Sequence, residues 1–159
     1  MRRAVPALPA AKTPRMTTTA ARPVPAAVSL SVLLWLAAIG AGVAEALVHL
    51  LTPVAPTLPA LAARFGLYAV LAVLVLALRT GRDAVRWAVA VLLGGVGTAS
   101  LVVEPIGWLV GGGSPAAFLA AADLPTLLAA GLRVAHVAAV VSALVLMFRS
   151  SANAWFRSR

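Results

Sequence analysis

Four long apolar runs dominate this sequence and leave the chain few folds to choose from. A helix needs about 20 predominantly apolar residues to cross the roughly 30 Å hydrocarbon core of a bilayer. Four segments meet that requirement, at about 27–51, 60–79, 84–104 and 125–148. We therefore predict an all-α fold, an integral membrane four-helix bundle that crosses the membrane four times.

The composition agrees with a membrane protein and excludes a soluble one. Apolar residues make up 62% of the chain and charged residues 11%, whereas soluble domains average roughly 45–50% and about 25%. A soluble globule of this size could not cover its surface with so few polar side chains. The chain has no cysteine, which excludes structural disulfides, thiolate metal sites and c-type haem attachment.

Helix-breaking residues separate the four runs, and the connections are too short to hold a soluble domain. The breaks fall at Pro53, Pro56 and Pro59, at the polar turn 80–83, and at the glycine-rich stretch 111–115. Before the fourth run, Asp123 is placed to cap the first helical turn and Pro125 suits a first-turn position.

The basic residues predict the orientation of the spans. The net charge is +9, from 13 basic against four acidic residues. Eleven of the 13 lie in the N-terminal arm, the second connection and the C-terminal tail, and the positive-inside rule places these regions in the cytoplasm. We expect both termini to be cytoplasmic and the chain to be a multi-pass protein of the plasma membrane. Because the basic residues flank apolar runs, nucleic acid is not an expected partner.

The same pattern divides the chain into three parts. Residues 1–25 form a predicted disordered basic arm in the cytoplasm, 26–149 form the four-helix domain, and 150–159 form a short basic cytoplasmic tail. Three other interpretations of the N-terminal region stay open. They are translation that begins at Met16, a signal peptide that ends near 44–46, and a targeting presequence for an organelle.

Every apolar run contains polar or ionisable residues, which are costly in lipid and usually face protein or water. The predicted intramembrane polar cluster consists of Glu45, His49, Arg64, Tyr68, Ser100, Glu104, Arg133 and His136. With a rise of about 1.5 Å per residue, Glu45 and Arg64 lie at similar depths, roughly 7–9 Å below the outer ends of their spans. We expect them to form an ion pair. Arg133 lies about 12 Å deep, and its long side chain can extend outward to a second pair with Glu104.

Two interpretations of this cluster lead to two functions. As a structural clasp it fixes the register of the helices, and the protein is then an accessory or structural membrane component without catalysis of its own. As an outward-facing polar cavity it binds a ligand or relays protons. The protein is then a small transporter or a proton-coupled ligand-binding protein that uses Glu45. We do not expect an enzyme, because a Ser100/His136 pair would lack an orienting acid and an oxyanion site.

No cofactor or metal is expected, and the expected partners are membrane components. His49 and His136 lie at different depths, so they cannot be the two axial ligands of one haem. Small residues repeat every four positions in the fourth run, at Gly131, Ala135, Ala139 and Ala143. Such stripes allow close helix packing, either within the bundle, against another membrane protein or in a homodimer, in addition to contact with the lipid bilayer.

Three stretches resemble a known group of proteins. They are GVAEALVHLL (42–51), RTGRDAVRWA (79–88) and VLLGGVGTASLVVEPIGWL (91–109). Together they resemble small four-span membrane proteins of high-GC actinobacteria, over about residues 28–149. That group has no assigned activity, so the resemblance implies a lineage and no mechanism.

Overall fold

Four membrane-length helices make up most of the structure, a computed structural model that describes residues 23–52 and 55–158. Within these ranges the chain is helical and has no β-strand. The helices that are long and apolar enough to cross a membrane are Ala26–Leu51, Leu58–Thr80, Asp83–Val110 and Leu124–Met147. Three of these helices match the bounds of the predicted spans to within two residues at each end, and the third helix is longer than predicted.

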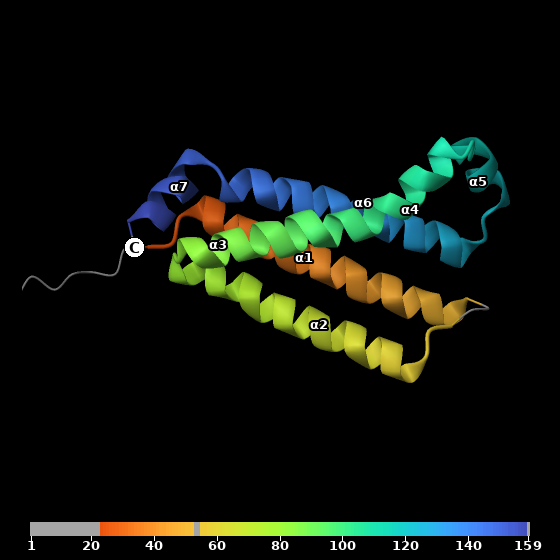
Figure 1. Cartoon of the computed structure of the whole chain (residues 1–159), viewed down its shortest axis with the longest axis horizontal. Helices are drawn as coiled ribbons and strands as arrows, with labels where there is room; N and C mark the ends of the chain where they lie inside the picture. Colours follow the sequence, from red (N-terminus) through yellow and green to blue (C-terminus); the bar gives the residue numbers. More distant parts are fainter. Residues whose placement is uncertain (1–22, 53–54, 159) are drawn as a thin grey trace, which may run out of the picture.

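Each span is built from one or more helical elements. The first is α1 (Ala26–Val48) with a 3-10 turn at His49–Leu51, and the second is α2 (Leu58–Leu76) with a 3-10 turn at Ala77–Thr80. The third is α3 (Asp83–Val89), a π-helical segment (Ala90–Gly97) and α4 (Thr98–Val110). The short α5 (Pro115–Ala121), the fourth span α6 (Leu124–Met147) and a final α7 (Ser150–Arg157) follow. The start of α1 and the end of α7 lie at the same end of the bundle (Figure 1).

Local sequence explains where the helices begin. Asp123 Oδ1 accepts the N–H of Thr126 at 3.0 Å, which caps α6 as predicted. Ser114 Oγ accepts the N–H of Ala117 in the same way and caps α5. The tight turn between the second and third spans depends on Gly81, which has φ of 75°. The break predicted at Pro53 and the arm 1–22 lie outside the described residues.

The third span continues six residues beyond its predicted end at position 104. Pro105 lies inside α4 and does not end it. A proline removes one backbone hydrogen bond, and spanning helices tolerate this where neighbouring groups compensate for it. The apolar residues that follow keep the helix going to Val110, and Gly111 is its C-cap.

A π-helical segment interrupts the third span where three glycines occur, at positions 94, 95 and 97. A Cβ on Gly94 would lie 3.1 Å from Leu144 Cδ1, so glycine there lets α6 approach. The Thr98 hydroxyl donates to the Leu93 carbonyl oxygen at 3.3 Å. Such segments are rare and often occur at functional positions.

The core lies toward the α7 end of the bundle and joins all four spans. Trp35, Val75, Val89 and Val140 are buried there. Two residues of the small-residue stripe, Ala139 and Ala143, pack into this core, whereas Gly131 and Ala135 are exposed.

The first and last spans are joined in the core by a buried hydrogen bond. The Ser31 hydroxyl donates to the Ala143 carbonyl oxygen at 2.9 Å. Because Ala143 has a short side chain, the backbone of α6 can come close to α1 at this point.

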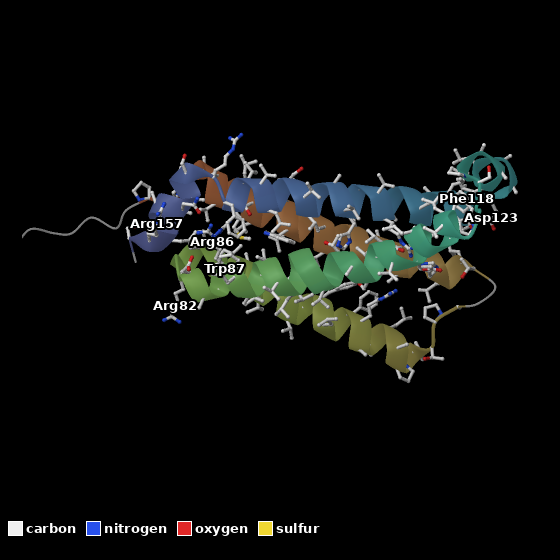
Figure 2. All side chains as sticks on the ribbon, turned by 45° about the horizontal axis from the view of Figure 1, so that its top comes forward. Arg82, Arg86, Trp87, Phe118, Asp123 and Arg157 are labelled. Carbon is white, nitrogen blue, oxygen red and sulfur yellow. The ribbon has the colours of Figure 1, made fainter. Side chains whose placement is uncertain are left out.

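The predicted basic tail 150–159 contains helix α7, which is anchored to the third span through Arg86. The Arg86 guanidinium donates to Asn153 Oδ1. It also lies 4.1 Å from the ring centroid of Phe148 and 5.2 Å from that of Phe156. We name Arg86, Asn153, Phe148 and Phe156 the α7 latch. Figure 2 shows Arg86 and Arg157 at this end, with Asp123 at the opposite end.

Candidate functional site

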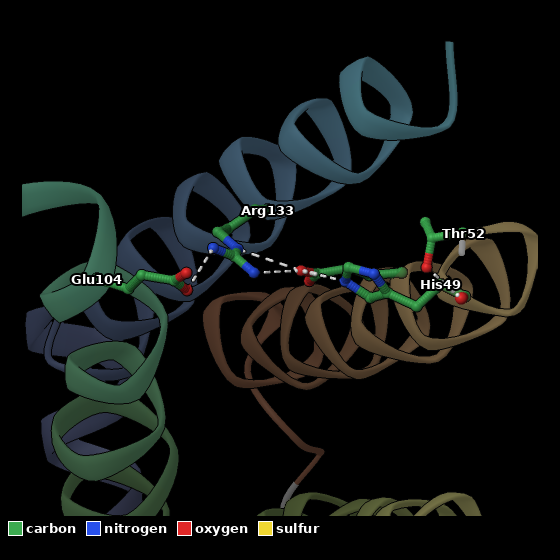
Figure 3. Close-up of polar contacts among 5 residues, drawn as sticks. His49, Thr52, Glu104 and Arg133 are labelled. Carbon is green, nitrogen blue, oxygen red and sulfur yellow. Dashed lines mark hydrogen bonds and ion pairs between the residues drawn. The ribbon is translucent and has the colours of Figure 1, made fainter. Parts of the chain in front are cut away.

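Arg133 on α6 connects two other helices through their glutamates. Its Nη2 and Nε atoms donate to Glu45 Oε1 on α1, at 2.7 and 3.1 Å. Its Nη1 atom lies 3.6 Å from Glu104 Oε2 on α4. Figure 3 shows Arg133 with Glu104 on one side and His49 of α1 on the other. We name Glu45, Arg133 and Glu104 the carboxylate–arginine triad.

The two carboxylates of the triad have very different surroundings. The Glu45 side chain is 8% exposed, and its Oε1 also lies 3.7 Å from His49 Nε2. The Glu104 side chain is 84% exposed, and its contact with Arg133 is the longer one. Glu45 is therefore the buried carboxylate of the triad. Glu104 is the exposed carboxylate, and it can contact another group in addition to Arg133.

One of the two predicted ion pairs is present and the other is wrong. Arg133 and Glu104 pair as expected. Glu45 binds Arg133 and not Arg64, which is exposed on α2 and forms no ion pair within the described residues. Depth along a helix gives the height of a side chain but not the neighbour that it faces. Because α1 packs most extensively against α6, the Glu45 carboxylate meets the arginine of α6.

Tyr68 and His136 come together beside Gly42, about one turn further into the bundle than Glu45. A Cβ on Gly42 would lie 2.8 Å from the Tyr68 hydroxyl and 3.5 Å from His136 Cε1. The glycine therefore makes room for the Tyr68 ring, and the His136 ring lies at ordinary contact distance from the same point. His136 Nδ1 is buried and has no hydrogen-bond partner in the described part of the chain. These two residues of the predicted cluster, Tyr68 on α2 and His136 on α6, thus approach α1 at the same point.

Ser100 does not join the other polar residues. Its hydroxyl donates to the Gly97 carbonyl oxygen of its own helix at 2.7 Å, and the side chain is exposed. Within the described residues, no hydrogen bond joins Ser100 to His136.

A groove that the sequence did not predict opens between α4, α5 and α6, on the Glu104 side of the triad. Its volume is about 770 Å³. The walls are apolar except for Glu104 and Arg133, and they include Trp108 and Phe118. These two rings meet edge to face with their centroids 6.1 Å apart. The closeness of Glu104, Pro105 and Trp108 in the sequence could have indicated one wall of this groove. The contribution of Phe118 from α5 could be recognised only in the structure.

The described residues contain no group of three or more His, Cys, Asp or Glu side chains that could hold a metal ion. Comparisons with protein family models, with curated proteins and with solved structures find no match for this chain.

Proposed function

We propose that this is a multi-pass protein of the plasma membrane that binds an amphipathic small molecule in the groove between α4, α5 and α6. The observation that carries the proposal is the groove itself. Its volume of about 770 Å³ falls in the range of small-molecule sites, roughly 300–1,000 Å³. Such sites are mostly apolar and have a few polar groups that orient the ligand, and here Glu104 and Arg133 are those groups.

The depth of the triad supports an amphipathic ligand. Glu45 precedes the end of its span by six residues, and Glu104 does the same in the third span. Both carboxylates therefore lie about 9 Å from the helix ends. With both termini in the cytoplasm, as the basic residues indicate, the groove belongs to the outer leaflet. A ligand there has an apolar body among lipid chains and a polar group at the triad.

The ligand contact is assigned to Glu104 in place of Glu45. The sequence-based alternative used Glu45 for ligand or proton binding. In the structure Arg133 donates two hydrogen bonds to Glu45, whose side chain faces away from solvent. Glu104 lines the groove and is exposed in it. Binding is preferred to catalysis because the Ser100 hydroxyl is engaged within its own helix.

Native mass spectrometry of the protein, extracted from its own membranes in mild detergent, tests the proposal. We expect a retained small molecule that is lost in Val134→Trp, because Val134 lines the groove and is 70% exposed. The matched control is Val141→Trp, on the same helix at 52% exposure but away from the groove lining. A protein that carries no small molecule, or that loses it equally in both variants, would contradict binding in the groove.

An accessory or structural role is the second candidate, and the triad favours it. One arginine that binds carboxylates from two other spans holds three helices in a fixed register, which is an attested use of buried charge. In the same spectra, a stoichiometric second protein without a small molecule would support this role, and its identity would name the process.

A further inference from the structure

We propose that the groove selects amphipathic monocations, such as lipophilic ammonium or phosphonium compounds. This inference rests on the proposed function, because it names the class of ligand that the same groove accepts. Three features of the groove lead to it: the charge of the triad, the acceptors on α4 and the aromatic pair.

The triad carries one more negative charge than positive charge. Glu45 and Glu104 share a single guanidinium, and Arg133 makes its closest contacts with Glu45. His49 lies beside Glu45 on the far side from the groove, and Arg64 pairs with neither carboxylate in the described residues. The uncompensated charge is therefore at Glu104, inside a groove with apolar walls. A carboxylate whose charge is only partly balanced by a shared guanidinium is costly at membrane depth, and a bound monocation would reduce that cost.

A second acceptor on α4 strengthens the preference for a positive ligand. Pro105 has no N–H, so the carbonyl of Leu101, four residues earlier, loses the helical hydrogen bond that it would otherwise accept. Leu101, Glu104 and Pro105 all line the groove. The Leu101 carbonyl oxygen carries a partial negative charge, and the Glu104 carboxylate, about one turn along the same helix, carries a full one.

The aromatic pair completes a site for a positive group with an apolar body. Trp108 and Phe118 line the groove, and the faces of such rings attract cations, most strongly in the case of tryptophan. An anion would be repelled by the carboxylates of the triad. Arg133 already donates to Glu45, so an anion could reach this guanidinium only beside two carboxylates of its own sign.

The test compares two probes of similar shape and opposite charge, tetraphenylphosphonium and tetraphenylborate. The full chain is reconstituted in nanodiscs of zwitterionic lipid, and binding is measured by equilibrium dialysis against empty nanodiscs. We expect saturable binding of the phosphonium at one site per chain, and binding of the borate at least about tenfold weaker. Equal binding of the two probes, or tighter binding of the borate, would overturn the inference.

Two pairs of variants locate the binding. Glu104→Gln removes the groove carboxylate and should weaken phosphonium binding about tenfold or more. Asp123→Asn removes one negative charge from an exposed cap outside the groove and should leave binding unchanged. If Glu104→Gln does not fold, Val134→Trp with its control Val141→Trp decides the question. Equal losses in Glu104→Gln and Asp123→Asn would mean a general surface-charge effect and would contradict the proposal.

The outcomes separate this inference from the proposed function. A neutral or anionic molecule retained from native membranes and displaced by Val134→Trp would leave the groove as a binding site. It would show that the groove does not select cations. If the unaltered protein retains no small molecule from native membranes and also does not bind the phosphonium, both proposals are overturned.

Discussion

Glu45 and Glu104 contact the same arginine, yet they have different physical roles. Glu45 is buried and accepts two hydrogen bonds from Arg133, so its charge is compensated inside the bundle. Glu104 is exposed in the groove, and its nearest contact with Arg133 is 3.6 Å. The residue types and their depths were predictable from the sequence. Their pairing was not, because it depends on which helix packs against α1.

Replacement of Arg133 by methionine tests the pairing directly. It leaves the Glu45 carboxylate buried without a cation, and the loss of one partner of a buried pair costs roughly 3–5 kcal/mol. We expect the free energy of unfolding in mild detergent to fall by about that amount. The matched variant is Arg64→Met, which also removes an arginine from the half of a span that lies away from α7. Because Arg64 is exposed, it should change stability little.

A double variant separates lost charge compensation from lost packing. Glu45→Gln together with Arg133→Met leaves no buried charge at this position, so it should recover most of the stability lost in Arg133→Met alone. Equal destabilisation by Arg64→Met and Arg133→Met would contradict the assignment of Arg133 as the partner of Glu45.

At the scale of the elements, the four spans could be predicted because length and hydropathy alone define a membrane helix. The end of the third span could not, because Glu104 and Pro105 look like a helix end in the sequence but lie inside α4. Helix α7 was also missed, since an eight-residue helix of mixed composition gives a weak signal. Its formation depends on tertiary contacts, in particular those of Arg86 with Asn153, Phe148 and Phe156.

The α7 latch predicts how the C-terminal helix detaches. Asn153 accepts a hydrogen bond from Arg86 and donates one to the Phe148 carbonyl oxygen. A hydrogen bond to a charged group is worth roughly 1.5–3 kcal/mol, so Asn153→Ala should raise local opening of α7 about tenfold or more. The chain has no cysteine, so Ala152→Cys, at a fully buried position, reports the opening as a maleimide-labelling rate. Ser151→Cys, which is exposed, is the control that should label quickly in both backgrounds. An unchanged rate at position 152 would show that the latch does not hold α7.

The cap of α6 predicts a pH dependence at acid pH. Hydrogen bonds from Thr126 lower the pKa of the Asp123 carboxyl below its ordinary value of 3.8. Folding therefore favours the charged carboxylate. This contribution to stability is complete above the pKa of the unfolded chain, and it is lost as the pH falls through the lower pKa of the folded chain. Asparagine also caps helices but does not titrate, so Asp123→Asn should lack this contribution to acid sensitivity. The difference between the unfolding curves of the two proteins at pH 6 and near pH 3 measures it, and parallel behaviour would contradict the cap.

At the scale of the whole molecule, the structure and the charge pattern bear on topology in different ways. An even number of spans places both ends of the described chain at one end of the bundle, as Figure 1 shows. The side of the membrane on which that end lies is a prediction from the basic residues, of which Arg82, Arg86 and Arg157 lie at this end (Figure 2). The groove between α4, α5 and α6 is at the other end, so its access from outside the cell depends on this orientation.

Single-cysteine labelling on intact cells tests the orientation and with it the route of the ligand. Ser114 lies at the start of α5 and Ser151 in α7, and both are exposed. With the termini in the cytoplasm, Ser114→Cys should react with a membrane-impermeant maleimide on intact cells, and Ser151→Cys should react only after permeabilisation. The reverse pattern would place the groove in the inner leaflet. An amphipathic cation would then reach Glu104 from the cytoplasmic side, the direction in which a negative membrane potential concentrates cations.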